Sequence, residues 1–156
     1  MMKQIPYGIT DFSRIQKENY YYVDKTGLIE KTNAVLNTRQ KFICVSRPRR
    51  FGKSMAADML AAYYDRGENS ASLFSSLKIH YVSSYQQHLN QYDVIKVNMQ
   101  EFLSQSSGIE GMLELLRKSL LWDLLEEYPD FMIYKWIIID NRSKNRQLLQ
   151  INWLLY

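Results

Sequence analysis

The chain has 156 residues, enough for one domain with a hydrophobic core, and its 46% hydrophobic and 13% aromatic content excludes a disordered tail. The net charge of +4 is uneven, with 13 Lys and Arg against 7 Asp and Glu in residues 1–80 and 7 against 9 in residues 81–156. A single cysteine, Cys44, excludes an intramolecular disulfide, and no stretch approaches the roughly 18 apolar residues of a membrane helix, so we expect a soluble cytoplasmic protein without membrane contact.

The first elements expected along the chain are two helices. A short helix is predicted over residues 11–19, and a second over residues 28–36. Asp24 or Thr26 is expected to cap the second helix, because a short oxygen-bearing side chain can accept from its unpaired N–H groups. Such a cap explains both residues without any ligand.

The next segments alternate between strand and helix. Residues 42–45 are four consecutive apolar residues and predict a buried strand, which runs into the sequence SRPRRFGKS at residues 46–54. Residues 55–64 are rich in good helix formers and are expected to end at a glycine cap, Gly67. Residues 94–99 are the second strand candidate.

The C-terminal third predicts one long helix and a further strand. Ser107 and Glu110 have the spacing of a capping box, an apolar stripe follows, and Pro129 is expected to end the helix. Residues 136–139 then predict a strand that runs into Asp140. The alternation predicts an α/β fold, an incomplete P-loop NTPase-like parallel sheet flanked by helices, with core strands near 42–46, 93–99 and 136–140.

SRPRRFGKS ends like a phosphate-binding loop. Gly52 lets the backbone approach an anion, Lys53 supplies charge for the terminal phosphates, and Ser54 supplies a hydroxyl for magnesium. Arg47 stands where such a loop has its first glycine, and Pro48 favours an extended conformation at Arg47, so the loop must enter by another backbone route. Taken alone, the motif fits a basic turn at a helix start equally well.

The charge around this loop points to an anionic partner. No acidic residue lies between Glu30 and Asp58, and residues 39–53 carry six lysines and arginines. Arg47, Arg49 and Arg50 could contact phosphates of a nucleotide or of a nucleic acid, or could be solvated loop residues.

Three motifs resemble the AAA-ATPase-like family of prokaryotic P-loop proteins, whose members often carry a PD-(D/E)XK nuclease-like domain further downstream. They are IPYGITDF at residues 5–12, YYYVDKT at residues 20–26 and RPRRFGKS at residues 47–54, the last similar to the family's Walker A loop. The resemblance implies ATP and Mg²⁺ as cofactors. It assigns nucleotide binding to Arg49, Arg50, Phe51, Gly52, Lys53 and Ser54, with the Ser54 hydroxyl on the metal.

The sequence departs from the family pattern near its end. The family's Walker B strand ends in Asp-Glu, whereas Asp140 is followed by Asn141, which cannot act as a base. Asp140 is the candidate Walker B-like carboxylate and could hold Mg²⁺ through a water. We expect residues 1–131 to be the N-terminal part of the family domain and residues 132–156 to be a divergent or frameshifted tail, so that ATP is bound while hydrolysis is in doubt.

Two further classes of function stay open from sequence. One is a noncatalytic basic interaction module that binds nucleic acid or a protein partner. The other is an inactive truncated gene product. The histidines, His80 and His88, have no metal-ligand spacing, and we assign them no metal.

Overall fold

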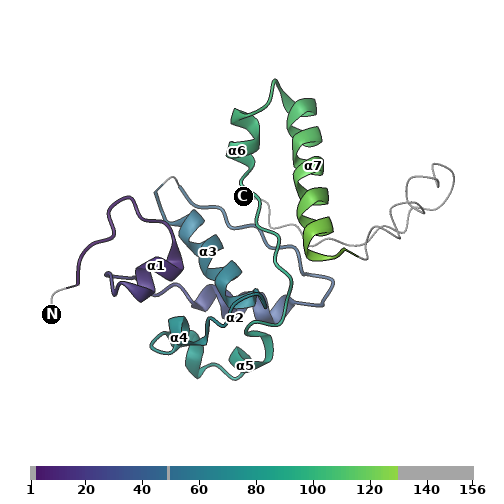
Figure 1. The fold of residues 1–156 in the computed structure, drawn as a ribbon. Coiled ribbons are helices and arrows are strands. Elements are labelled where there is room, and N and C mark those ends of the chain that lie inside the picture. Colours follow the sequence, from purple (N-terminus) through teal and green to yellow (C-terminus); the bar gives the residue numbers. More distant parts are fainter. Residues whose placement is uncertain (1–2, 49, 130–156) are drawn as a thin grey trace. The chain divides into compact units, whose positions relative to one another are not determined.

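The computed structural model describes residues 3–48 and 50–129, and these residues divide into two compact units, with the division in the chain after Val97 (Figure 1). Each unit is described by itself. The first contains α1 (Phe12–Lys17), α2 (Gly27–Val35), α3 (Lys53–Tyr64), α4 (Ala71–Phe74), the 3-10 helix η1 (Lys78–Tyr81) and α5 (Tyr85–His88). The second contains α6 (Met99–Ser104) and α7 (Ile109–Glu127).

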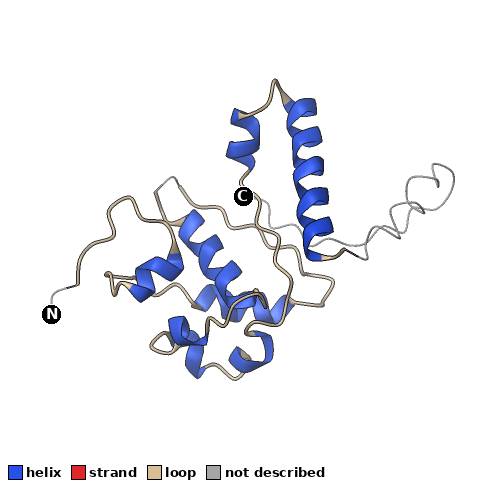
Figure 2. Ribbon diagram, viewed as in Figure 1, coloured by secondary structure: helices blue, strands red, loops and turns tan. Residues whose placement is uncertain are grey.

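The predicted α/β fold is wrong for the part of the chain that the structure describes. Helices and loops account for all of it, and no strand is present there (Figure 2). An isolated parallel bridge joins Asp65 to Tyr92, and Asp65 is the residue directly after α3. A parallel P-loop sheet is therefore not the architecture of these residues.

The predicted strand at residues 42–46 is an unpaired, exposed segment. No described residue forms a backbone hydrogen bond with it, and the Phe42 side chain is 74% exposed. An apolar run forms a buried strand only when neighbouring strands satisfy its backbone and other elements cover its two faces. Neither condition holds here, so the apolar pattern does not produce a strand.

The other two strand predictions meet different outcomes. Residues 93–97 also lack backbone hydrogen bonds with described residues, and Met99 begins α6, so the prediction at 93–99 is wrong. The candidate at 136–140 lies outside the described residues, as does the tail at 132–156.

The helix predictions are confirmed, while several of their caps are not. α3 ends at Tyr64 and its C-cap residue is Asp65, which has an extended conformation, so Gly67 is not the cap. α7 begins after Gly108 (φ 108°) without a side-chain capping bond, so the predicted capping box of Ser107 and Glu110 is absent. Thr26 does precede α2, yet its side chain bonds elsewhere than to that helix's amides.

The core of the first unit gathers apolar and aromatic side chains from all of its helices. Phe12 of α1, Tyr63 of α3 and Phe74 of α4 are fully buried. The Phe74 ring centroid lies 5.1 Å from that of Phe12 and 5.5 Å from that of Tyr63. Burying such rings is the main source of stability in a unit of this size.

Buried polar groups join α2 to α3 within this core. The Tyr64 hydroxyl donates to Oδ1 of Asn33 at 2.7 Å and lies 2.5 Å from Oγ1 of Thr32. Nδ2 of Asn33 donates to the Tyr63 hydroxyl at 3.1 Å. These bonds satisfy polar atoms that would otherwise be buried at a cost, and they fix the position of α3.

The second unit is a pair of helices, α6 and α7, that pack on each other. Asn98 caps α6 by accepting from the Gln100 amide at 3.2 Å. Met112 and Leu116 are the buried residues of α7, while Ile109 and Trp122 are 70% and 74% exposed.

Candidate functional site: the loop before α3

The segment at residues 46–52 leads directly into α3. Gly52 is the residue before the helix and has a left-handed conformation with φ 74°, which glycine adopts without steric cost. Arg50 is also left-handed, with φ 68°, whereas Arg47 is not among the described residues with positive φ. The loop therefore turns at residues 50 and 52 rather than at the position where a phosphate-binding loop has its first glycine.

Two lysines donate hydrogen bonds to carbonyl oxygens of this loop. Nζ of Lys53 lies 2.6 Å from the oxygen of Arg47 and 3.2 Å from that of Pro48. Nζ of Lys25 lies 2.9 Å from the oxygen of Phe51. Both ammonium groups are therefore held against the loop backbone.

No carboxylate of the described residues neutralises the cations around this loop. Within residues 3–48 and 50–129, none of Lys25, Arg47, Arg50 and Lys53 forms an ion pair. Arg47 and Arg50 are exposed. Four unpaired cations over one loop create a positive potential that attracts anions.

Hydrogen-bond donors for an anion are present at the same place. No described residue accepts a hydrogen bond from the amides of Phe51 and Gly52. The first amides of α3 have no partner inside the helix, and the positive end of the helix dipole lies there. Ser54 in the first turn is exposed, and no described residue bonds its hydroxyl. These donors suit phosphate oxygens.

Five of the six residues expected from sequence to bind nucleotide are described, and they are consecutive in the chain at the start of α3: Arg50, Phe51, Gly52, Lys53 and Ser54. Arg49 and Asp140 lie outside the described residues. Lys25 is the residue that sequence reasoning missed as part of this loop. Its signal was present, because the motif YYYVDKT includes it, but a helix cap explained the neighbours Asp24 and Thr26 and drew no attention to the lysine.

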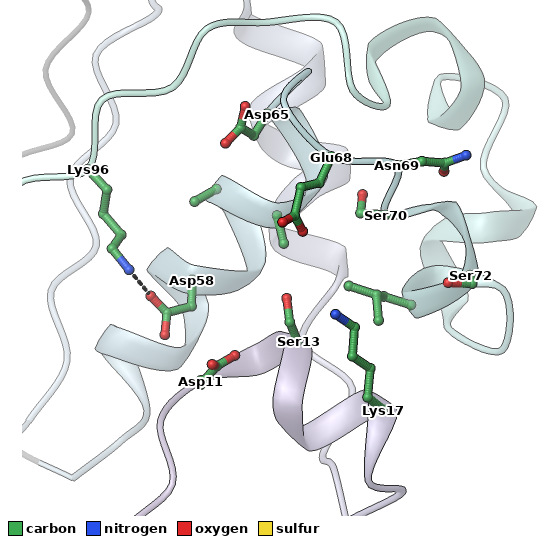
Figure 3. A pocket seen from close by; sticks show the side chains of 13 residues that line it. Asp11, Ser13, Lys17, Asp58, Asp65, Glu68, Asn69, Ser70, Ser72 and Lys96 are labelled. Carbon is green, nitrogen blue, oxygen red and sulfur yellow. Dashed lines mark hydrogen bonds and ion pairs between the residues drawn. The ribbon is translucent and has the colours of Figure 1, made fainter. Parts of the chain in front are cut away.

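A separate pocket of about 420 Å³ lies between α1, α3 and the segment after α3, and none of its lining residues belongs to the loop (Figure 3). Figure 3 shows Asp58 paired with Lys96 at its edge, with Nζ and Oδ1 2.6 Å apart. Asp11, Asp65, Glu68 and Lys17 also line it. Among the residues with a described placement, no three His, Cys, Asp or Glu side chains are grouped so as to hold a metal ion.

None of the described helices has both the length and the apolar character needed to cross a membrane.

Comparison with known proteins places the chain in a family. The sequence model of the family described as Predicted AAA-ATPase matches residues 6–152. The chain is also 40% identical over 79 residues to an uncharacterized protein in the vnfD 5′ region of Azotobacter chroococcum mcd 1. The matched part is 50% of this chain and 14% of that relative, so the chain spans a small part of the relative's length. No solved structure matches. Because the family match covers most of its length, the chain belongs to the predicted AAA-ATPase family.

Proposed function

We propose that the loop at residues 46–54 binds the phosphates of ATP. The observation that carries this proposal is that one loop at the start of α3 holds cations and amides for which the described part of the chain offers no acidic partner and no acceptor. Membership of a family described as predicted AAA-ATPase supports the choice of nucleotide.

Each loop residue has a role in this proposal. Lys53 would exchange its two carbonyl partners for oxygens of the β and γ phosphates. The amides from Arg50 to Lys53 would surround the phosphates, with Arg49 as a further cation. The exposed Ser54 hydroxyl would be one ligand of Mg²⁺, which takes its remaining ligands from phosphates and waters.

We propose binding and not hydrolysis. Hydrolysis requires a residue that orients the attacking water, and in the family pattern this residue is the glutamate after the Walker B aspartate. The sequence offers Asp140 followed by Asn141 in place of the family's Asp-Glu pair. ATP binding by this chain does not depend on that second acid.

The test is equilibrium binding of labelled ATP, with and without Mg²⁺, to the wild-type chain and to Lys53→Ala. Lys31→Ala is the matched control, because Lys31 is an exposed lysine on α2 and its removal changes the net charge equally. We expect Lys53→Ala to weaken binding at least about tenfold, as the loss of a charge-assisted contact does, and Lys31→Ala to leave it unchanged. Equal binding by all three proteins would contradict the proposal.

The same proteins distinguish nucleic-acid binding. A basic interaction module would bind DNA or RNA with an affinity that falls steeply with salt and is indifferent to ATP. Competition by ATP, together with the loss in Lys53→Ala, is the result expected from a nucleotide site.

A further inference from the structure

The residues on both sides of Lys25 are anchored to η1. Oδ1 of Asp24 accepts from the Thr26 amide at 2.8 Å and from the Thr26 hydroxyl at 2.6 Å. Oδ2 of Asp24 accepts from the Lys78 amide at 2.8 Å, at the first residue of η1. The Asp24 carboxylate therefore ties the turn before α2 to a segment more than fifty residues away in sequence.

Thr26 completes this anchor from inside the core. It is fully buried, and its Oγ1 accepts from the Ile79 amide at 3.2 Å. Lys25 lies between the two anchored residues and is itself exposed. The backbone of Lys25 is thus fixed, and its side chain extends from a defined point toward the loop.

The Lys25 ammonium group lies against one peptide of the loop. Its Nζ donates to the Phe51 oxygen at 2.9 Å and is 2.9 Å from the place where a Cβ on Gly52 would stand. Within the described parts of the chain it has no carboxylate partner. A cation in contact with a carbonyl oxygen, and with no acid to compete, holds that carbonyl in place.

Holding the Phe51 carbonyl also determines where the Gly52 amide points. The peptide bond between them is trans, as are all those of the described residues, so its C=O and N–H point in opposite directions. With the oxygen turned toward Lys25, the Gly52 N–H is turned away from it. A rotation of this peptide would turn the Gly52 N–H to the opposite side of the loop and put the Phe51 carbonyl oxygen in its place.

We propose that Lys25 is a positioning residue for phosphate binding, which holds the Phe51–Gly52 peptide with its N–H directed at the phosphates. This inference rests on the proposed function of the loop. Lys25 acts through the backbone, on the side of the peptide opposite to the anion, while Lys53 contacts the anion itself. The motif YYYVDKT thereby gains a role that a helix cap does not provide.

The experiment compares wild type, Lys25→Ala, Lys25→Arg and the control Lys31→Ala. The first readout is the affinity for ATP. The second is the set of amide NMR signals from protein labelled with ¹⁵N-glycine, and the chain has six glycines. The Gly52 signal, assigned with Gly52→Ala, reports the orientation of the peptide in the absence of nucleotide. A general loss of structure would move the other glycine signals as well.

We expect Lys25→Ala to weaken ATP binding about tenfold, because the loop then has to be ordered on binding. The Gly52 amide should shift and exchange faster in this variant, with the Gly8 and Gly27 amides unchanged. Lys25→Arg keeps a cationic donor and should restore most of the affinity, and Lys31→Ala should match wild type.

Two results would overturn the inference, and only one of them would also overturn the proposal that the loop binds ATP. If Lys25→Ala binds ATP within twofold of wild type and its Gly52 signal is unmoved, while Lys53→Ala loses binding, only the role of Lys25 fails. If the wild-type chain does not bind ATP, both proposals fail.

Discussion

Nζ of Lys53 lies 2.6 Å from the carbonyl oxygen of Arg47, six residues earlier in the chain. The first residue of α3 therefore holds the entry of the loop that precedes it. To bind phosphate, the ammonium group has to exchange this neutral carbonyl for a charged oxygen, which is the stronger acceptor. If Lys53 binds nucleotide as we propose, then nucleotide binding and release of the loop entry are coupled events.

This coupling predicts how the loop responds to a protease. Phe51 is 60% exposed, so chymotrypsin can cleave after it whenever the loop opens. Lys53→Ala removes the bonds to Arg47 and Pro48 and should speed this cleavage about three- to tenfold, the effect of one or two weak hydrogen bonds.

ATP should slow the same cleavage in wild type, because phosphates bound by Lys53 and the loop amides would restrain the loop more than the released carbonyl bonds did, and it should leave the cleavage unchanged in Lys53→Ala. Mass spectrometry of the fragments gives the rates, and cleavage after Tyr7, which is 97% exposed, is the internal control. Equal rates after Phe51 in both proteins would show that Lys53 does not restrain the loop.

Gly52 is the second position where the loop geometry makes a quantitative prediction. A side chain there would adopt φ 74° and would meet Nζ of Lys25 at 2.9 Å. The lysine end can move, but the left-handed backbone cannot be relieved, so Gly52→Ala should cost about 1–2 kcal/mol of unfolding free energy.

Gly27→Ala is the matched control. Gly27 is the first residue of α2, and nothing lies within 4 Å of its added Cβ. This variant should be neutral or stabilising by up to about 1 kcal/mol. Urea unfolding followed by circular dichroism checks both, and an equal effect of the two substitutions would rule out backbone strain at Gly52.

The sequence predicted helices better than it predicted strands. Helix patterns are local: an amphipathic segment such as residues 12–17 satisfies its own backbone and only has to bury one face. A strand at 42–46 needs partners elsewhere in the chain, and a run of four apolar residues carries no information on whether they are present. The run of apolar residues is real, but the prediction that it is buried was wrong, since Phe42 is 74% exposed.

The candidate loop could be proposed from sequence because its residues are contiguous. Gly52, Lys53 and Ser54 are adjacent, so their spacing, together with the family resemblance, made them candidates. Lys25 could not be found in this way, since it reaches the loop through the anchoring of Asp24 and Thr26 to η1, more than fifty residues later. Contacts of that kind depend on tertiary packing and leave no spacing pattern.

The Asp24 anchor predicts a dependence of stability on pH. Burial by itself raises the pKa of Asp24, but hydrogen bonds from the Thr26 side chain and from the Lys78 and Thr26 amides outweigh it and lower the pKa below the ordinary value of 3.8. A group whose pKa is depressed in the folded state stabilises it above the unfolded-state pKa. That stabilisation is lost as the pH falls through the folded-state pKa.

Asp24→Asn should therefore cost about 1–2 kcal/mol at pH 7, the loss of bonds to a charged acceptor, and progressively less below about pH 4. Urea unfolding at several pH values between 7 and 2.5 measures the difference. Glu68→Gln, at an exposed position, is the control and should show little difference at any of these values. A cost for Asp24→Asn that stays constant down to the lowest pH would contradict the anchor.

The hydrogen bonds between α2 and α3 predict that removing one hydroxyl, that of Tyr64, lowers the free energy of unfolding. Tyr64→Phe removes the donor to Asn33 Oδ1, on a residue that is 7% exposed, while Thr32 Oγ1 keeps its bond to the Ile29 oxygen at 2.9 Å. Leaving the buried Asn33 oxygen without this donor should cost about 1–3 kcal/mol. Tyr81→Phe, on a side chain that is 81% exposed, should change the unfolding free energy by less than about 0.5 kcal/mol. Similar values for the two variants would exclude a stabilising role for this network.

Phe42 distinguishes the helical arrangement described here from the α/β fold expected from sequence. In a central strand of a sheet covered on both faces, Phe42→Ser would leave a cavity and bury a hydroxyl, at a cost of about 3 kcal/mol or more. In this structure the side chain is 74% exposed and its backbone is unpaired. We therefore expect the unfolding free energy to change by less than about 0.5 kcal/mol, together with a gain in solubility as an exposed ring is lost.

Phe74→Ala is the reference for a buried ring, since Phe74 is fully buried in the first unit, and it should cost about 3–5 kcal/mol. Urea unfolding followed by circular dichroism measures both variants. A loss of unfolding free energy in Phe42→Ser close to that in Phe74→Ala would show that residue 42 is buried in the protein, and would contradict the exposed segment.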